Sequence, residues 1–448
     1  MKTREMDMTQ GSPLKLVLAL ALPILLTNFG QQFYQIADAA IIGRGVGVRA
    51  LAAVGSADWS CWLVLWGVMG LTQGFSVFVA QYYGRKDFVL MNRAIAMSTV
   101  LCALIGCAMT LVGAFVARPL LVLLGTPTDI LADATVYLEV MIAGTAAITA
   151  YNMAASVLRA FGDGRTPLWA MGIAAAVNIG LDLLFVFAFH WGVFGVAIAS
   201  VIAQAISFVY CLRRIRCVSC VRLDAEAWRP DRRMILDLLR LGLPFAFQHV
   251  VIAVGGIVLQ SAINAQGSAF VAGFTATNKL YGLLECSAIS LGLAFSTYLS
   301  QNFGAGLYDR FRKGVRLGVG LMFAIVPILM AVILPLGEPL LRLFIDAGEN
   351  VGAEALTIAW RYLRNMVLLH IFLYLIYVYR TALLSAGDAL WPMVSGFAET
   401  GTRVLVALWA VRTFGVDVLF FVEPAAWITS VVFNAVPYYC KRLGSLRR

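Results

Sequence analysis

The stretch LVLALALPILLTNFGQQFYQIA, residues 16–37, carries no charged side chain over 22 consecutive positions. A helix needs roughly 20 mostly apolar residues to cross the hydrocarbon layer of a membrane. Further runs of similar length are equally free of charge, at residues 59–84, 94–117, 191–212 and 317–337. Membrane β-barrel strands are short and alternate apolar with polar residues, so these runs indicate spanning helices instead.

The composition supports the same class of protein. Of the 448 residues, 61% are hydrophobic and only 13% are charged, which is more apolar surface than one soluble core could bury. The first fifteen residues are polar. The apolar run that follows them is too long for a cleavable signal peptide and lacks a small-residue cleavage site, so we expect no processing. The sequence predicts an all-α polytopic protein embedded in the lipid bilayer.

Polar breaks between apolar runs divide the chain into twelve predicted spans. They cover residues 16–42, 55–82, 93–117, 134–158, 167–189, 194–213, 241–263, 269–301, 315–336, 357–384, 391–412 and 418–440. The predicted organisation is an amino tail (1–15), a first six-helix bundle (16–213), a linker (214–240), a second six-helix bundle (241–440) and a carboxyl tail (441–448). The linker is expected to end in an amphipathic helix on the membrane surface.

The two halves repeat each other at a nearly constant spacing. LALPIL at residue 20 matches LGLPFA at 241, VAQYYGRKD at 79 matches LSQNFGAGLYD at 299, and LRAFGDGRTPLW at 158 matches LLSAGDALWPMV at 383. An ancestral unit of six helices was therefore duplicated. Because six is even, both copies enter the membrane from the same side and form parallel repeats. In such folds the substrate path lies between the bundles, which rock against each other.

Positive charge is concentrated in alternate connections between the predicted spans. Most of the 34 Lys and Arg residues lie in the amino tail, in the linker and in the other segments on the same side of the membrane. This bias predicts that both termini face the cytoplasm. We therefore interpret the net charge of +10 as interacting with lipid headgroups and the membrane-insertion machinery, and we expect no nucleic-acid partner.

Two acids inside predicted spans are candidates for binding an ion. Asp38 lies far along the first span, with Tyr34 one helical turn before it, and Asp182 lies in the fifth span, with Asn178 one turn before it. A carboxylate in the bilayer centre costs at least roughly 2.5 to 3.5 kcal/mol, so it needs a function. Carboxylate, amide and phenol groups can take up a proton or hold a small cation. The alternative for both acids is a side chain that reaches interfacial water.

The second half carries different acids. Glu399 has Arg403 four residues later, a spacing that favours an internal ion pair. Glu285 has no base within one turn, because Lys279 is nearly two turns away, so a contact with a cationic substrate is one interpretation. Pro23 in the first span removes a backbone hydrogen bond, and it is either a static kink or a bend that moves Asp38.

Other metal chemistry finds little support in the sequence. Cys217 and Cys220 form a single C-x-x-C without a second pair, and His190, His249 and His370 lack partners at ligand spacing. We therefore interpret the cysteines as loop and packing residues, and we expect no cofactor apart from a coupling ion.

Three stretches together resemble the multidrug and toxic compound extrusion (MATE) transporters. They are LALPILLTNFGQQFYQIADAAIIGR from residue 20, LRAFGDGRTPLWAMGIAAAVNIGLDLLF from residue 158 and GVFGVAIASVIAQ from residue 192. The resemblance covers nearly the whole chain. It combines an Asp in the first span, an R-x-x-G-D-x-x-x-P loop and N-x-x-x-D in the fifth span.

The resemblance implies a V-shaped pair of six-helix bundles that works as an antiporter in the cell membrane. It implies export of amphipathic, often cationic, drugs or metabolites by a single chain in exchange for protons or sodium ions. The ion-coupling residues carried over are Asp38, Asn178 and Asp182, with Tyr34 and Asn152 as neighbours. Ser200 stands where a Thr is frequent and would complete a sodium site. Glu285 and Pro23 are assigned to the substrate pathway.

One feature departs from another branch of the family. That branch has an acid soon after G-L-P in the seventh span, whereas GLPFAFQHVVIAV at 242–254 contains none, so a sodium site in the second bundle is not expected. Two rival functions stay open at this point. A flippase for lipid-linked precursors would have a larger cationic cavity. An intramembrane transferase would need an acidic or histidine cluster near the headgroups, and no such motif is found, so we predict no enzymatic activity.

Overall fold

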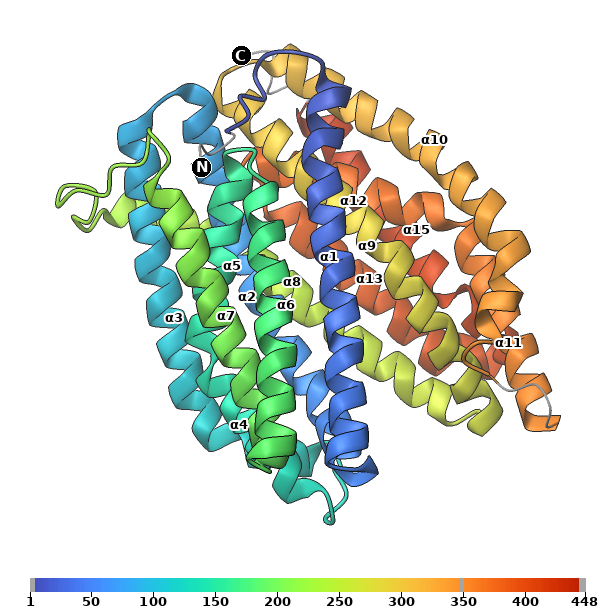
Figure 1. Ribbon diagram of the computed structural model, residues 1–448. Helices are drawn as coiled ribbons and strands as arrows, with labels where there is room; N and C mark the ends of the chain where they lie inside the picture. Colours follow the sequence, from blue (N-terminus) through green and yellow to red (C-terminus); the bar gives the residue numbers. More distant parts are fainter. Residues whose placement is uncertain (1–4, 346–349, 443–448) are drawn as a thin grey trace. The chain divides into compact units, whose positions relative to one another are not determined.

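The computed structural model describes residues 5–345 and 350–442, and every regular element in that part of the chain is helical (Figure 1). Residues 1–4 of the expected amino tail and 443–448 of the expected carboxyl tail lie outside the described residues. The described chain divides into two compact units. The first unit contains residues 5–11, 18–246 and 304–306, and the second contains residues 12–17, 247–303, 307–345 and 350–442.

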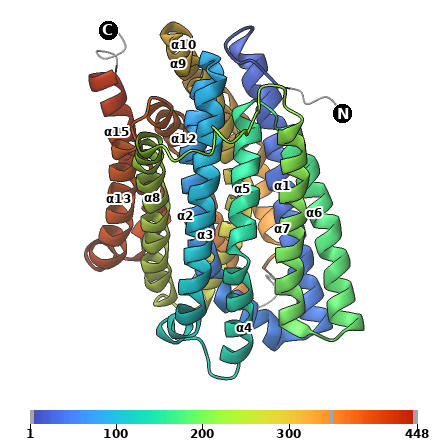
Figure 2. The same ribbon diagram turned by 90° about the vertical axis from the view of Figure 1, so that its left-hand side faces the viewer.

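The first unit is built from the helices of the first half of the chain, except that the first turn of α1, up to Val17, is assigned to the second unit. They are α1 (Pro13–Gly45), α2 (Val48–Arg85), α3 (Phe88–Leu123), α4 (Leu131–Ala143), α5 (Thr145–Ala160), α6 (Arg165–Leu183), the π-helical turn η1 (Leu184–Ala188) and α7 (Gly192–Arg216). The helices α6 and α7 lie side by side in both views, with α1 next to α6 (Figures 1 and 2).

The second unit takes the remaining helices, of which α8 begins in the first unit. They are α8 (Arg232–Asn264), α9 (Ser268–Gly304), α10 (Tyr308–Leu341), α11 (Asn350–Leu368), α12 (His370–Ser385), α13 (Leu390–Leu405), η2 (Val406–Ala410), α14 (Val411–Phe414), η3 (Val416–Phe421), α15 (Val422–Pro437) and η4 (Tyr438–Arg442). Of these, η2 and η4 are π-helical and η3 is a 3-10 helix.

Each of the twelve predicted spans coincides with a helical segment of the described chain. Within residues 5–345 and 350–442, nine helices are long and apolar enough to cross a membrane, and eleven spans result if α4–α5 and α11–α12, each bent by 47°, are counted as single spans. The remaining segment, from α13 to α14, contains Glu399 and Arg403, which lower its hydropathy. The prediction of a polytopic α-helical membrane protein is therefore confirmed.

The repeat predicted from the sequence is visible in local geometry. Both halves contain a helix broken by 47°, at Gly144 and at Leu369, which are 225 positions apart. Both also place a glycine with a left-handed backbone in the next connection, Gly162 with φ 79° and Gly387 with φ 82°. A π-helical turn then interrupts the following span in each half, as η1 and as η2.

The linker is shorter than the predicted range 214–240, because α8 starts at Arg232 and continues into the seventh span. Asp231 explains this start, since its Oδ1 accepts hydrogen bonds from the backbone N–H groups of Arg233 (3.0 Å) and Met234 (3.1 Å). The backbone N–H of Met234 is the main group that lowers the pKa of Asp231. The predicted surface helix is therefore the first part of a spanning helix.

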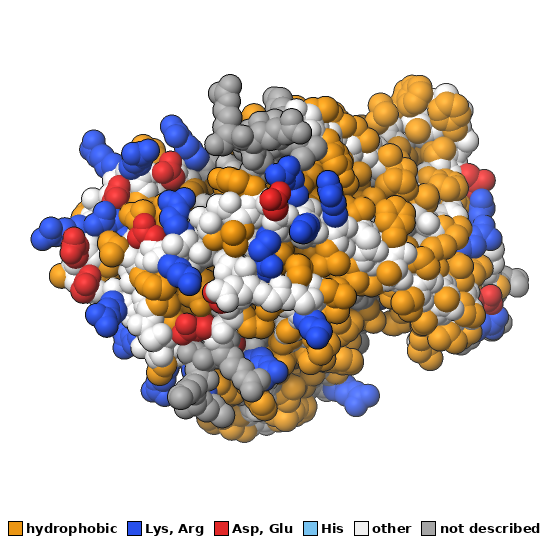
Figure 3. Space-filling view, turned by 90° about the horizontal axis from the view of Figure 1, so that it is seen from above, with side chains coloured by type: hydrophobic (Ala, Val, Ile, Leu, Met, Phe, Trp, Pro, Cys, Tyr) orange, Lys and Arg blue, Asp and Glu red, His pale blue; other side chains and the backbone are white. Residues whose placement is uncertain are grey.

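The surface of the molecule matches a lipid environment. Large apolar side chains such as Phe115 and Leu123, each 82% exposed, point outward from α3. Figure 3 looks on to the end of the helices that carries the connection between α7 and α8, where Lys and Arg side chains gather, while apolar side chains cover the sides. Soluble proteins rarely expose so large an apolar surface to water, so these sides face the bilayer.

Candidate functional site

The loop between α5 and α6 fixes where the polar face of α6 begins. Gly162 adopts a left-handed backbone, and Asp163 Oδ1 then accepts from the backbone N–H groups of Arg165 (3.1 Å) and Thr166 (3.0 Å). This carboxylate cap satisfies backbone donors at the first turn of α6. The R-x-x-G-D-x-x-x-P motif is therefore a structural device that sets the start and rotation of the helix carrying Asn178 and Asp182.

Asn178 and Asp182 lie on one buried face of α6. Asn178 is 1% exposed and Asp182 is fully buried, as their spacing of one turn predicts. The side-chain amide of Asn178 donates to Ser200 Oγ of α7 at 3.3 Å. Ser200 thus belongs to the same cluster as Asn178. The π-helical turn η1 starts two residues after Asp182, and such turns are frequent at functional sites.

The helix α1 brings its own polar face to this cluster. The carboxyl groups of Asp38 and Asp182 are electrostatic neighbours, close enough to share a hydrogen bond when one of them is protonated. Tyr34, one turn before Asp38, interacts with both acids and accepts a hydrogen bond from the side-chain amide of Gln204. Four of the sequence-predicted residues, Asp38, Asp182, Asn178 and Tyr34, are therefore brought together with Ser200.

The cluster has more acceptors than donors. Buried oxygens without a hydrogen-bond partner among the described residues are Asp38 Oδ1, Asn178 Oδ1, Asp182 Oδ1, Asp182 Oδ2 and Gln204 Oε1. Buried polar atoms are normally paired, because an unpaired one costs roughly 1 to 3 kcal/mol. Since every unpaired atom here is an oxygen acceptor, the group that would satisfy them is positively charged or a donor.

Two adjacent carboxylates, Asp182 fully buried and Asp38 half-buried, are unfavourable while both are ionised. Binding one positive charge relieves both their repulsion and the surplus of acceptors. A proton would do so by binding a carboxylate oxygen, and a sodium ion by taking oxygen ligands from Asp38, Asn178, Asp182 and Ser200. The described residues contain no group of three or more His, Cys, Asp or Glu side chains that could hold a metal ion.

Two predicted residues occupy other positions. The side-chain amide of Asn152 donates to the carbonyl of Ile148 at 2.9 Å, a hydrogen bond within its own helix. Pro23 is buried where α1 faces Gly164 of the α5–α6 loop, and α1 continues through it as one helix. The neighbouring Thr27 hydroxyl donates to the Pro23 carbonyl at 2.8 Å, which stabilises the turn after the proline.

Sequence reasoning missed Gln204 and Tyr151. Both act on Tyr34, Gln204 as a hydrogen-bond donor and Tyr151 as an electrostatic neighbour. A signal for Gln204 was present, because it lies four residues after Ser200 and so shares its face of α7. Tyr151 stands next to Asn152 on α5, so the sequence directed attention to the right part of this helix but not to Tyr151 itself.

In the second unit, Glu399 forms the predicted ion pair with Arg403, with 2.9 Å between Glu399 Oε1 and Arg403 Nη2. Glu285 lies on α9, and its Oε1 accepts from the hydroxyl of Tyr377 on α12 at 3.5 Å. These carboxylates thus differ from Asp182 in having donors within reach.

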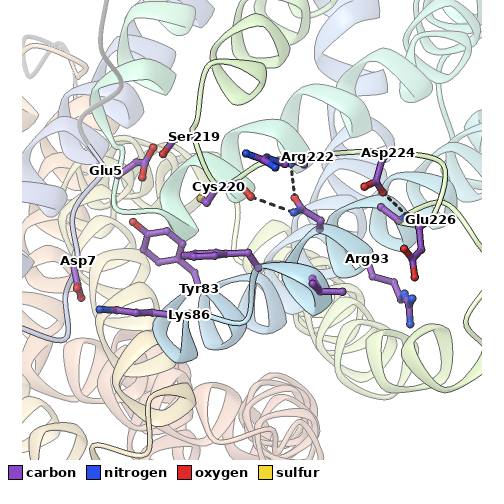
Figure 4. A pocket seen from close by; sticks show the side chains of 14 residues that line it. Glu5, Asp7, Tyr83, Lys86, Arg93, Ser219, Cys220, Arg222, Asp224 and Glu226 are labelled. Atoms are coloured by element: carbon purple, nitrogen blue, oxygen red, sulfur yellow. Dashed lines mark hydrogen bonds between the residues drawn. The ribbon is translucent and has the colours of Figure 1, made fainter.

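A separate cavity of about 520 Å³ lies on the first unit, between residues 5–7, the α2–α3 turn and the α7–α8 connection (Figure 4). Its walls carry both signs of charge, and Lys86 points toward Asp7. Asn92 fastens the connection, since its amide donates to the Cys220 carbonyl (3.1 Å) and its oxygen accepts from the Arg222 backbone N–H (3.1 Å). Burial raises the pKa of Cys220 to about 11. The lining contains none of the predicted site residues.

Comparisons with known proteins agree on one family. The probable multidrug resistance protein YoeA of Bacillus subtilis is 27% identical over 398 residues, covering 86% of this chain and 84% of its own length. The probable multidrug resistance protein YpnP of the same organism is 29% identical, covering 79% of each chain. A solved MOP superfamily transporter from Pyrococcus furiosus matches with a TM-score of 0.90 and 20% identity over 100% of both chains. The MatE family model matches residues 23–184 and 244–409, one segment in each half, and the chain therefore belongs to the MatE family.

Proposed function

We propose that this protein is a secondary active antiporter that exports small amphipathic, often cationic, organic molecules across the cell membrane. The exported molecule is exchanged for protons or sodium ions, and the single chain is the transporting unit, with both termini in the cytoplasm. Membership of the MatE family and similarity to proteins named as probable multidrug resistance proteins support the export function. The transport role involves no enzymatic step.

One observation carries the ion-coupled part of this proposal. In the first unit, five buried acceptor oxygens from α1, α6 and α7 lack a donor among the described residues, and two of the side chains are adjacent carboxylates. A purely structural cluster would contain matching donors, as the Glu399–Arg403 pair of the second unit does. An exchangeable positive ion supplies what the first cluster lacks.

Coupling follows from where the cluster lies. Asp38 and Tyr34 belong to α1, whereas Asp182 and Ser200 belong to α6 and α7, so an ion bound between them favours the packing in which α1 is held against α6. If the organic substrate favours the other packing, ion and substrate must lower each other's affinity by the same factor. Uptake of the ion then drives release of the substrate.

Ethidium transport by purified protein in liposomes tests this proposal. Proton and sodium gradients are imposed separately, and the wild type should move ethidium against its gradient with at least one of them. Asp38→Asn and Asp182→Asn should no longer move ethidium against its gradient. An amide carries no negative charge for a proton or sodium ion to neutralise. Asp309→Asn is the matched control, since Asp309 is exposed at the start of α10, where it pairs with Arg312 at 3.1 Å. Full gradient-driven transport by Asp182→Asn would refute the assignment.

A further inference from the structure

The second unit contains a buried network of charged side chains on three helices. Arg403 Nη2 lies 2.9 Å from Glu399 Oε1 and 2.8 Å from Glu423 Oε2, and Arg403 Nε donates to Glu423 Oε1 at 3.0 Å. Arg380 of α12 adds a second guanidinium, 3.4 Å from Glu399 Oε2. The two arginines are about 7% exposed, so their charges are held away from water and are balanced within the network.

Glu285 of α9 stands at the edge of this network. Tyr377 donates to its carboxylate at 3.5 Å, and Tyr281, one turn earlier on α9, is a second phenol within hydrogen-bonding reach. Its charged neighbours are Glu423, Glu399 and Arg403. Glu285 is thus a third carboxylate in a region that contains two guanidinium groups.

The count of charges leaves Glu285 uncompensated. Arg403 pairs with two carboxylates and Arg380 with one, and Glu285 forms no ion pair within the described part of the chain. Lys279, the base on α9 itself, is exposed and nearly two turns away from Glu285. Glu285 is half-buried, so its ionised carboxylate gives up part of its hydration without gaining an ion pair, and a bound proton removes this cost.

The local donors distinguish a proton from a metal ion. Around Glu285 the near neighbours are phenol hydroxyls that donate to it, and a sodium ion would need several oxygen ligands in their place. Two buried nitrogens also lack partners among the described residues, Arg403 Nη1 and Arg380 Nε. These N–H donors can receive an ionised carboxylate, so the network can accommodate Glu285 after the proton has left.

The network occupies the place in the second repeat that the ion cluster occupies in the first. Asp182 lies two residues before η1 and Arg403 lies three residues before η2, in the corresponding span. In the first unit, the unpaired oxygen acceptors near η1 need an exchangeable cation. In the second unit, the corresponding position near η2 is occupied by permanently charged guanidinium groups. Of the three carboxylates in this network, Glu285 is the one without a guanidinium partner among the described residues, so it is the one left to exchange a positive charge.

We propose that Glu285 is a second proton-exchanging site, so that the transporter takes up a proton in its second unit in addition to the ion held by the Asp38 and Asp182 cluster. The Glu285 carboxylate accepts one proton from water on one side of the membrane and returns it to water on the other side. This inference rests on the proposed antiport function, and it adds one proton to each transport cycle.

The titratable and charged groups facing Glu285 come from every helix packed around it. They are Tyr281 on α9, Tyr377 and Arg380 on α12, Glu399 and Arg403 on α13, and Glu423 on α15. Behind Tyr281 lies His370, which is 1% exposed, contacts the Tyr281 ring and has no partner for either ring nitrogen among the described residues. Of these groups, Glu285 is the carboxylate without a guanidinium partner.

Carbodiimide labelling tests the site without any substitution. Dicyclohexylcarbodiimide reacts with protonated carboxyl groups in apolar surroundings, and peptide mass spectrometry locates the adduct. Glu285 should be labelled in the purified wild type, increasingly as the pH falls, with no protection by sodium. Protection by sodium would identify a sodium site and overturn the proposal. Absence of the adduct at every pH, with labelling recovered in unfolded protein, would also overturn it.

Ethidium accumulation in liposomes tests the proton count. With the membrane potential clamped, equal sodium on both sides and a pH difference of one unit, each exchanged proton multiplies the attainable ethidium gradient about tenfold. Glu285→Gln, which mimics the protonated side chain, should therefore reach a gradient about tenfold lower than the wild type. Glu338→Gln is the matched control, because Glu338 lies on the same unit in an exposed pair with Arg342.

The outcomes separate this inference from the function on which it rests. An unchanged gradient in Glu285→Gln would overturn the second site while leaving the antiport proposal intact. A wild type without gradient-driven transport would refute antiport, and labelling of Glu285 would then still decide whether the carboxyl takes up a proton. Glu285→Asp, which retains a carboxyl, should keep the wild-type proton count and exclude a purely steric effect.

Discussion

Asp182 and Glu399 are both buried carboxylates in corresponding spans of the two halves, yet their neighbours give them opposite roles. Glu399 is contacted by Arg403 and Arg380, so its charge is permanently balanced. Both oxygens of Asp182 lack a donor among the described residues, and the nearest charged group is another carboxylate. Burial alone therefore does not identify a coupling residue. The balance of donors and charges around the carboxylate does.

Ser200 offers a test of the cluster at the scale of one atom. Its Oγ accepts the Asn178 amide at 3.3 Å, which orients Asn178 Oδ1 for the ion. Ser200→Ala should weaken the apparent affinity for the coupling ion about fivefold, because one hydrogen bond contributes about 1 kcal/mol. The measurement is the ion concentration for half-maximal ethidium transport in liposomes.

Ser200→Thr is the matched control for that experiment, because it retains the hydroxyl and should keep the affinity close to that of the wild type. Ser207, also on α7, donates to the Ala170 carbonyl at 3.1 Å and is not part of the cluster. Ser207→Ala should leave the ion affinity unchanged. Equal affinities in Ser200→Ala and the wild type would remove Ser200 from the ion site.

At the scale of elements, the connections before α6 and α13, each with a glycine in the left-handed backbone region, position the helices that bear the buried polar residues. Gly162 precedes the cap of α6, and Gly387 precedes Asp388, which caps α13 through the Leu390 N–H at 3.1 Å. Each connection thereby fixes the helix that bears the polar residues of its half. The surroundings differ, since a Cβ on Gly162 would lie 2.7 Å from Met6 Cβ, whereas a Cβ on Gly387 would meet nothing within 4 Å.

This difference predicts unequal effects of two matched substitutions. Gly162→Ala and Gly387→Ala should each lose about 1 to 2 kcal/mol from the left-handed backbone. Gly162→Ala should lose more, because the methyl group also displaces the segment around Met6, whose backbone N–H donates to the Phe161 carbonyl at 2.9 Å. Thermal unfolding midpoints in detergent provide the measurement. Met6→Gly should restore part of the loss, and equal midpoints for the two alanine variants would show that the Met6 contact contributes nothing.

The elements also show what the sequence could predict. Apolar runs separated by polar breaks located the twelve helical segments found in the described residues, because hydropathy acts over some twenty residues and needs no tertiary information. The spacing of Glu399 and Arg403 predicted their ion pair, since both lie on one helix. Gln204, Arg380 and Glu423 were missed as partners, because they approach from other helices and their contacts depend on helix rotation. The linker was predicted too long, because the cap at Asp231 was not recognised.

At the scale of the whole molecule, the duplicated halves have diverged in how they neutralise buried acids. The first unit uses a cluster that requires an external cation, and the second uses two arginines paired with two carboxylates, Glu399 and Glu423, with Glu285 left beside them. Loss of Arg403 should be costly for stability, since removing one partner of a buried pair costs roughly 3 to 5 kcal/mol. The buried charge is exchangeable in the first unit and largely fixed in the second. The two units can therefore respond differently to the same ion gradient.

Antiport makes a prediction about the stability of the entire chain. A ligand that binds the folded state raises its stability, by about 2.7 kcal/mol at one hundred times its dissociation constant. The coupling ion and ethidium should each raise the thermal midpoint in detergent. Their combined effect should be smaller than the sum of the two, because exchange requires each to lower the affinity for the other. In Asp182→Asn the ion's effect should disappear and the ethidium effect should become independent of the ion, whereas Asp309→Asn should behave as the wild type. A combined shift larger than the sum would indicate co-transport and exclude exchange.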